Sequence, residues 1–231
     1  MFEQSLQTSG AAAPRTETGR HIELADGTAY VRIEGPEEGN PLVLVHGEAQ
    51  SSDAFDALVP HLGAFGFRTL RFDLFGHGRS SEARDAYTTE LYARQTLDVV
   101  AATGFARPAA VLGLSLGAAF AAAAASHRPG WFDRLALVAP RLYSIALFGD
   151  SSDDYAALRG LRCDLLVVAA GEDHVTSTAE VACVRHLLPS HRYVEIGGAD
   201  HDLVATDAEP LAAVVRWFAE PVGPRLPLHA A

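Results

Sequence analysis

One serine of this chain stands in a setting that can turn a hydroxyl oxygen into a nucleophile. Ser115 is the centre of a G-x-S-x-G pentapeptide, Gly113–Gly117, which follows the apolar run 109–112 and precedes the alanine-rich run 118–126. This context predicts a strand, a sharp turn and a helix, with glycines that let the two elements approach closely and leave the hydroxyl exposed above a sheet. The amide of Leu116 would point into the same space from the first turn of the helix, as half of an oxyanion hole.

A serine hydroxyl is a weak nucleophile at neutral pH, so this chemistry needs further groups. A histidine must take the hydroxyl proton, and a carboxylate must orient the imidazole and stabilise its charged form. A second amide must help to hold the developing oxyanion. The pentapeptide contains neither a histidine nor an acidic residue. These groups must therefore come from elsewhere in the chain.

Three other segments stand around the pentapeptide in a familiar order. Segment 41–47 has the pattern of a buried strand that ends in a His-Gly turn. Segment 73–80 has the pattern D-x-x-G-H-G-x-S, and segment 193–201 is a strand-like run followed by a loop that ends in a histidine. With these segments, residues 20 to 220 resemble the α/β-hydrolase superfamily.

The resemblance implies roles for individual residues. The His-Gly turn would supply the second oxyanion amide, which by position is that of Glu48. The D-x-x-G-H-G-x-S loop would be structural, and His201 would be the catalytic base, last in the order serine, acid, histidine. Such a site needs no metal or organic cofactor, and no pair of histidines has the helix spacing of a zinc site.

The acid has more than one candidate. The family usually places its carboxylate three residues after a glycine, but the residue three past Gly171 is His174. Either Ala170 replaces that glycine or the loop is one residue shorter, and both interpretations lead to Asp173. Asp200 would point away from the adjacent histidine along an extended backbone and is expected at the surface. Other carboxylates remain open, either next to Asp173 or in the preceding loop: Glu172, Asp150, Asp153 and Asp154.

Composition limits the class of protein. A chain of 231 residues that is 48% hydrophobic can form one domain with a substantial core. A formal charge of −11 disfavours nucleic acids and anionic membranes as partners. Cys163 and Cys183 lack metal-site spacing, and residues 1–20 lack the pattern of a secretory signal, so we expect a cytoplasmic protein.

We expect a flexible N-terminal tail over 1–20, a single α/β-hydrolase domain over 21–220 and a C-terminal tail over 221–231. A hairpin signal at Asp26-Gly27 predicts two antiparallel strands within 21–35. Strands and helices then alternate, which implies a mostly parallel sheet of the eight-stranded type with helices on both faces. Strands are expected over 42–46, 68–73, 109–114, 134–139, 165–169 and 193–196, and helices over 53–63, 88–102, 118–126, 178–188 and 210–218.

Many members of the superfamily carry a multi-helix cap, but segment 140–162 leaves room here for only one or two short helices. We therefore expect a reduced cap and a pocket that is open on one side. Apolar residues of this segment and of the D-x-x-G-H-G-x-S loop are the expected substrate-binding residues: Phe75, Leu142, Tyr143 and Phe148.

These observations favour a serine hydrolase that cleaves a carboxylic ester, thioester or lactone. An acyl transferase, lyase or cyclase could use the same triad, because a fold does not determine a reaction. A non-catalytic ligand-binding protein on this scaffold is a further alternative. We expect a small-molecule or carrier-tethered acyl substrate and no nucleic-acid or membrane partner, and the sequence leaves a homodimer open.

Overall fold

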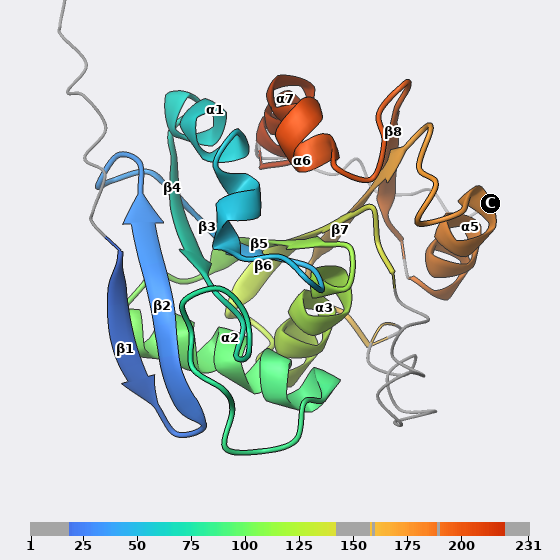
Figure 1. Cartoon of the computed structure of the whole chain (residues 1–231). Helices are drawn as coiled ribbons and strands as arrows, with labels where there is room; N and C mark the ends of the chain where they lie inside the picture. Colours follow the sequence, from blue (N-terminus) through green and yellow to red (C-terminus); the bar gives the residue numbers. More distant parts are fainter. Residues whose placement is uncertain (1–18, 142–157, 159, 189, 220–231) are drawn as a thin grey trace, which may run out of the picture.

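The computed structural model of the chain describes residues 19–141, 158, 160–188 and 190–219. Its centre is an eight-stranded sheet with the order β1-β2-β4-β3-β5-β6-β7-β8 (Figure 1). β2 runs antiparallel to β1 and to β4, and all other neighbours are parallel. The strands are β1 Arg20–Leu24, β2 Gly27–Glu34, β3 Asn40–Val45, β4 Phe67–Phe72, β5 Ala109–Leu114, β6 Phe132–Val138, β7 Asp164–Ala170 and β8 Arg192–Ile196.

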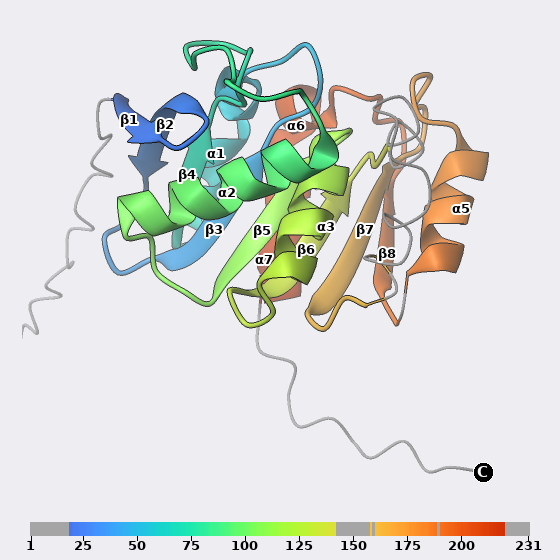
Figure 2. The same ribbon diagram turned by 90° about the horizontal axis from the view of Figure 1, so that it is seen from below.

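Helices cover the sheet on both faces, as the alternating pattern predicts. One face packs against α2, α3 and α5, and the other against α1, α6 and α7 (Figure 2). The helical elements are η1 Ser52–Phe55, α1 Leu58–Ala64, α2 Thr89–Thr103, α3 Gly117–His127, α5 Thr178–Leu187, α6 Leu203–Thr206 and α7 Ala208–Ala219.

The central strands have apolar side chains on both faces. In β3, Val43 and Val45 belong to the cluster under α2 and α3, whereas Leu42 and Leu44 belong to the cluster under α1 and α7. Successive side chains of a strand point to opposite faces, so a parallel strand covered on both sides is a continuous apolar run. This is why 42–45 is apolar at every position.

The alanine-rich helix α3 lies beside α2 on one face of the sheet and packs against both (Figure 2). All of its residues from Gly117 to Ala125 are buried. Small side chains allow a helix to be covered on opposite sides without pushing its neighbours apart. Packing against the sheet and against α2 therefore holds α3 in place after the turn.

The predicted fold class is confirmed, but one predicted helix is divided and one short helix was not expected. The helix expected over 53–63 is divided into η1 and α1. Pro60 has no amide hydrogen to donate to the carbonyl of Asp56, so it fits the first turn of α1 but not the middle of a longer helix. Helix α6, with four residues, is too short to produce a periodic pattern and was not predicted.

Some predictions concern residues that the structure describes only in part. Most of the reduced cap expected over 140–162, and most of both expected tails, lie outside the described residues. No helix in the described ranges is long and apolar enough to cross a membrane. Cys163 and Cys183 are both free thiols.

Candidate active site

Ser115 lies in a strained turn between β5 and α3. Its φ of +54° is in the left-handed region, which residues other than glycine rarely adopt. A Cβ atom added to Gly113 would lie 2.5 Å from the Cα of Ala118, and one added to Gly117 would lie 2.4 Å from the carbonyl oxygens of Val45 and His46. Only glycine fits at these two places. The pentapeptide thus brings α3 close enough to β3 and β5 to form the sharp turn.

The structure brings Ser115, His201 and Asp173 together from three separate strand ends. The Nε2 atom of His201 is 3.0 Å from the Oγ atom of Ser115. The Nδ1 atom of the same ring is 2.9 Å from the Oδ2 atom of Asp173. Ser115 follows β5, Asp173 follows β7 and His201 follows β8, and these parallel strands end at one edge of the sheet. A proton of the serine hydroxyl therefore has a direct path to an imidazole that a carboxylate orients.

Asp173 is well held as the carboxylate partner. Its side chain is only 4% exposed, and its Oδ1 atom accepts hydrogen bonds of 2.7 Å from the amides of Val175 and Thr176. The Oδ2 atom is left for His201. These bonds hold the carboxylate in one orientation.

The rival carboxylates lie elsewhere or cannot be placed. Glu172 is exposed, and Asp200 is exposed and accepts the amide of Asp202. The three aspartates of the preceding loop lie outside the described residues: Asp150, Asp153 and Asp154.

The amides of Glu48 and Leu116 are available for an oxyanion. Neither amide donates a hydrogen bond to any residue that the structure describes. The loop of Glu48 lies next to the serine, since a Cβ atom on Gly47 would be 3.1 Å from the Cβ of Ser115. The amide of Gly47 donates to the Oε1 atom of Gln50 at 3.2 Å, which holds this loop. Two unpaired amides beside a serine oxygen have the composition of an oxyanion hole.

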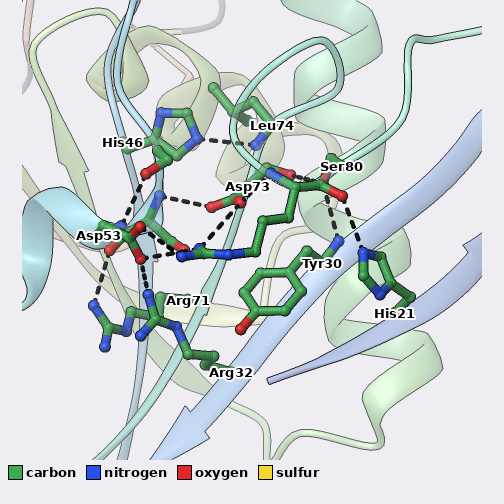
Figure 3. A network of polar contacts seen from close by, with 12 residues as sticks. His21, Tyr30, Arg32, His46, Asp53, Arg71, Asp73, Leu74 and Ser80 are labelled. Carbon is green, nitrogen blue, oxygen red and sulfur yellow. Dashed lines mark hydrogen bonds and ion pairs between the residues drawn. The ribbon is translucent and has the colours of Figure 1, made fainter. Parts of the chain in front are cut away.

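His46 joins the Glu48 loop to the loop after β4. Its Nδ1 atom donates to the carbonyl of Gly47 at 2.8 Å, and its Nε2 atom accepts from the amide of Leu74 at 2.9 Å (Figure 3). Burial lowers the pKa of His46 from 6.5 to about 4. The ring is therefore neutral near pH 7, as one donor and one acceptor nitrogen require. His46 thus has a structural role in joining these two loops.

Asp73, the first residue of the D-x-x-G-H-G-x-S loop, is fully buried. Its carboxylate accepts the amides of Ser52 and Arg79, each at 2.7 Å (Figure 3). The hydroxyl of Ser80 donates to the carbonyl of Asp73 at 2.6 Å, which closes the loop on itself. This motif thus anchors the loop that lies next to the candidate site.

A group of ion pairs also supports this loop. The guanidinium of Arg71 is buried and pairs with Glu34 at 2.6 Å and with Asp56 at 2.5 Å. Asp53 pairs with Arg79 at 2.9 Å and also with Arg32 (Figure 3). These contacts connect η1 to β2, β4 and the loop after β4.

A pocket of about 220 Å³ opens beside the serine. It is bounded by the two residues with free amides, by the loop after β4 and by the start of α2 and α3, through Glu48, Leu74, Gly76, His77, Glu82, Tyr87, Tyr92, Leu116 and Phe120. Sequence reasoning missed most of this wall. Irregular loops have no periodicity that shows where Glu82 and Tyr87 point.

Of the predicted substrate-binding residues, only Phe75 is described by the structure, and it does not line this wall. Phe75 is fully buried in the core cluster under α2, so its side chain does not reach the pocket. Its carbonyl instead accepts the hydroxyl of Tyr92 at 3.3 Å. The other three lie outside the described residues: Leu142, Tyr143 and Phe148. No group of three or more metal-ligating side chains occurs in the part of the chain that the structure describes.

This chain belongs to the α/β-hydrolase fold family, whose model matches residues 40–159. It is 47% identical over 62 residues to a haloalkane dehalogenase of Mycobacterium marinum, a match that covers 25% of this chain and 21% of that protein. The matched stretch is thus about a fifth of that relative's length.

Solved structures share the fold over nearly the whole chain. A Thermoplasma acidophilum hydrolase described as CIB-like superimposes with a TM-score of 0.77 at 20% identity, over 89% of this chain and 98% of that one. The enol-lactonase of Burkholderia xenovorans superimposes with a TM-score of 0.75 at 19% identity, over 86% and 99%. At these identities the similarity establishes the fold alone.

Proposed function

We propose that this protein is a serine hydrolase that cleaves a carboxylic ester, thioester or lactone through an acyl-enzyme on Ser115. The observation that carries the proposal is the continuous path from Ser115 Oγ to His201 Nε2 at 3.0 Å and from His201 Nδ1 to Asp173 at 2.9 Å. A strained turn, two unpaired amides and an adjoining pocket support it.

In the first half of the reaction, the oxygen of Ser115 attacks the substrate carbonyl carbon while its proton moves to Nε2 of His201. The carbonyl oxygen becomes an oxyanion that accepts hydrogen bonds from the amides of Glu48 and Leu116. One such donor is worth about 3 kcal/mol in comparable sites. The imidazolium then protonates the departing alcohol or thiol, which leaves an ester on Ser115.

In the second half, water replaces the alcohol. His201 takes a proton from the water as it attacks the acyl carbon, and the same two amides hold the second oxyanion. Collapse returns the proton to Ser115 and releases the carboxylic acid. Asp173 keeps the proton on Nδ1 throughout, so that Nε2 is the atom that accepts.

The chemistry of serine favours acyl substrates over the alkyl halides named for the Mycobacterium marinum relative. Attack of Ser115 on a carbon that bears a halide would form an alkyl ether. An ether has no carbonyl carbon for water to attack, so the enzyme would stop after one turnover. An acyl-serine, in contrast, can be hydrolysed by the group that formed it.

Active-site labelling tests the proposal directly. A fluorophosphonate probe should label Ser115 alone, identified by peptide mapping, and Ser115→Ala should lower kcat for p-nitrophenyl esters by about a thousandfold or more. Ser126→Ala, at the other end of α3, is the matched control and should keep wild-type turnover. Labelling at Ser51 or Ser80, unchanged turnover in Ser115→Ala, or steady chloride release from a 1-chloroalkane would overturn it.

A further inference from the structure

The pocket beside Ser115 is lined by aromatic rings and carboxylates, with no arginine in its wall. Tyr87, Tyr92 and Phe120 supply the rings, and Glu48 and Glu82 supply the carboxylates. The ring of Tyr92 stacks on that of Tyr87 at 6.1 Å and lies 4.6 Å from that of Phe120. The faces of such rings carry partial negative charge. The rings and both carboxylates of this wall therefore disfavour an anion, and the imidazole of His77 is the further titratable group that lines it.

Among the described residues, Glu48 is a carboxylate without a paired cation. It is exposed, and its side chain accepts no hydrogen bond and forms no ion pair with any described residue. Glu82 also lacks a cationic partner within the described ranges, since the group that it binds is the neutral hydroxyl of Tyr87. Two carboxylates thus face one aromatic pocket without an arginine to neutralise them.

The two carboxylates act on the pocket interior. Burial raises the pKa of Tyr92, and the nearby Tyr87 and the charges of Glu48 and Glu82 raise it further. The carboxylate charges that disfavour a tyrosinate would stabilise a cation placed against the ring.

We propose that this pocket binds an alkylammonium group of the substrate, so that the preferred substrates are acyl compounds that carry a cation near the scissile bond. The inference deepens the proposed function, on which it rests for the reacting bond. Glu48 and Leu116 belong both to the pocket wall and to the pair of unpaired amides. A substrate with its carbonyl oxygen on those amides can therefore place a neighbouring group in the pocket.

A binding experiment separates this inference from catalysis. Choline and 3,3-dimethylbutan-1-ol have the same shape and differ in charge, so calorimetric titration of the full chain at about 0.15 M salt compares them while distant charges are screened. We expect choline to bind at least about tenfold more tightly than the alcohol. Ser115→Ala should keep this preference, because the cation does not need the nucleophile.

Matched variants identify the groups responsible. Glu48→Gln should weaken choline binding by about five- to tenfold and leave binding of the neutral alcohol unchanged. Glu38→Gln removes an equal charge from the exposed loop between β2 and β3 and should have no effect. Tyr87, at 38% exposed, can be changed with little risk to folding: Tyr87→Leu should weaken choline binding, whereas Tyr87→Phe keeps a ring and should retain it.

Each outcome has one meaning. Equal binding of choline and the alcohol, no binding of either, or an equal loss in Glu38→Gln would overturn the cation site. If choline binds selectively but no ester is hydrolysed, the proposed function fails and the cation site stands. If Ser115 hydrolyses choline esters and their 3,3-dimethylbutyl analogues with equal kcat/KM and choline does not bind selectively, the function stands and the cation site fails.

Discussion

Two clusters of this molecule contain the same three residue types, a serine, a histidine and an aspartate, and they differ in what those residues bind. In the cluster around the loop after β4, the three side chains form their hydrogen bonds to described residues with main-chain groups, and Asp73 has in addition a long ion pair of 3.9 Å with Arg79. His46 binds one carbonyl and one amide, Asp73 accepts two amides, and Ser80 joins the carbonyl of Asp73 to the amide of Tyr30. None of these hydrogen bonds joins two side chains that could exchange a proton during a reaction.

In the candidate triad, the bonds run from side chain to side chain. His201 contacts Ser115 with one nitrogen and Asp173 with the other, and its side chain remains 17% exposed. Leu116, the residue after the serine, lines the adjoining pocket. The comparison shows that residue types alone do not define a reactive site: a reactive group needs a partner that can take its proton and a free side for the substrate.

The largest expected difference between the clusters is in turnover. Asp173→Asn should lower kcat by about a thousandfold to ten-thousandfold, because the amide can still accept from Val175 and Thr176 but presents a donor to His201 and favours the wrong tautomer. The melting temperature should change little. Stopped-flow or steady-state ester hydrolysis, with thermal unfolding alongside, measures both.

Glu172→Gln is the control for Asp173→Asn, because Glu172 is exposed next to it and should tolerate the change. A larger loss of kcat in Glu172→Gln than in Asp173→Asn would give Glu172 the role of the acid. Mild effects in both variants would indicate that the acid is in the preceding loop, at Asp150, Asp153 or Asp154.

The main-chain cluster should instead control the pH dependence of stability. Above pH 6.5, His46 is neutral in the folded and unfolded chain and contributes no slope. Between pH 6.5 and about 4, the unfolded chain binds a proton that the folded protein excludes, so the free energy of unfolding falls as pH falls. The total loss is about 3 kcal/mol, reached below the folded pKa.

Urea unfolding at a series of pH values tests this prediction. His46→Gln keeps an acceptor for the amide of Leu74 and should show a shallower decline than the wild type between pH 6.5 and 4. His186→Gln changes an exposed histidine and should follow the wild-type curve. Parallel curves for wild type and His46→Gln would contradict the assigned shift.

The smallest of these effects is expected at Asp73. Asp73→Asn can accept only one of the two amides of Ser52 and Arg79, and the other would be left unpaired in a buried position. We expect a loss of about 2 kcal/mol in the free energy of unfolding, measured in urea at pH 7. Asp85→Asn, with a side chain 67% exposed, should stay within about 0.5 kcal/mol of the wild type.

Local patterns predicted the parts of the fold that local forces decide. The apolar runs of β3, β5, β6 and β7 identify strands buried on both faces. Gly113 and Gly117 identify the turn at Ser115, because close backbone contacts exclude any side chain there. Pro60 is a local indication that the helix is interrupted, although the apolar residues around it suggested one continuous helix.

The walls of the site could not be predicted in the same way. Phe75 was expected at the substrate and is buried in the core, whereas Tyr87 and Glu82, which no motif indicates, line the pocket. These residues lie on irregular segments, where no period of two or 3.6 relates position to direction.

By itself, the sequence determined the alternation of strands and helices, the sharp turn at Ser115 and the arrival of a histidine and several carboxylates at one edge of the sheet. Tertiary structure decided which carboxylate meets His201: the amides of Val175 and Thr176 hold Asp173 in place, and Glu172 is left exposed. It also decided that the carboxylates of Glu48 and Glu82 share a pocket with three aromatic rings. Hydrogen-bonding and packing partners far apart in the chain set these choices, and a linear pattern does not contain them.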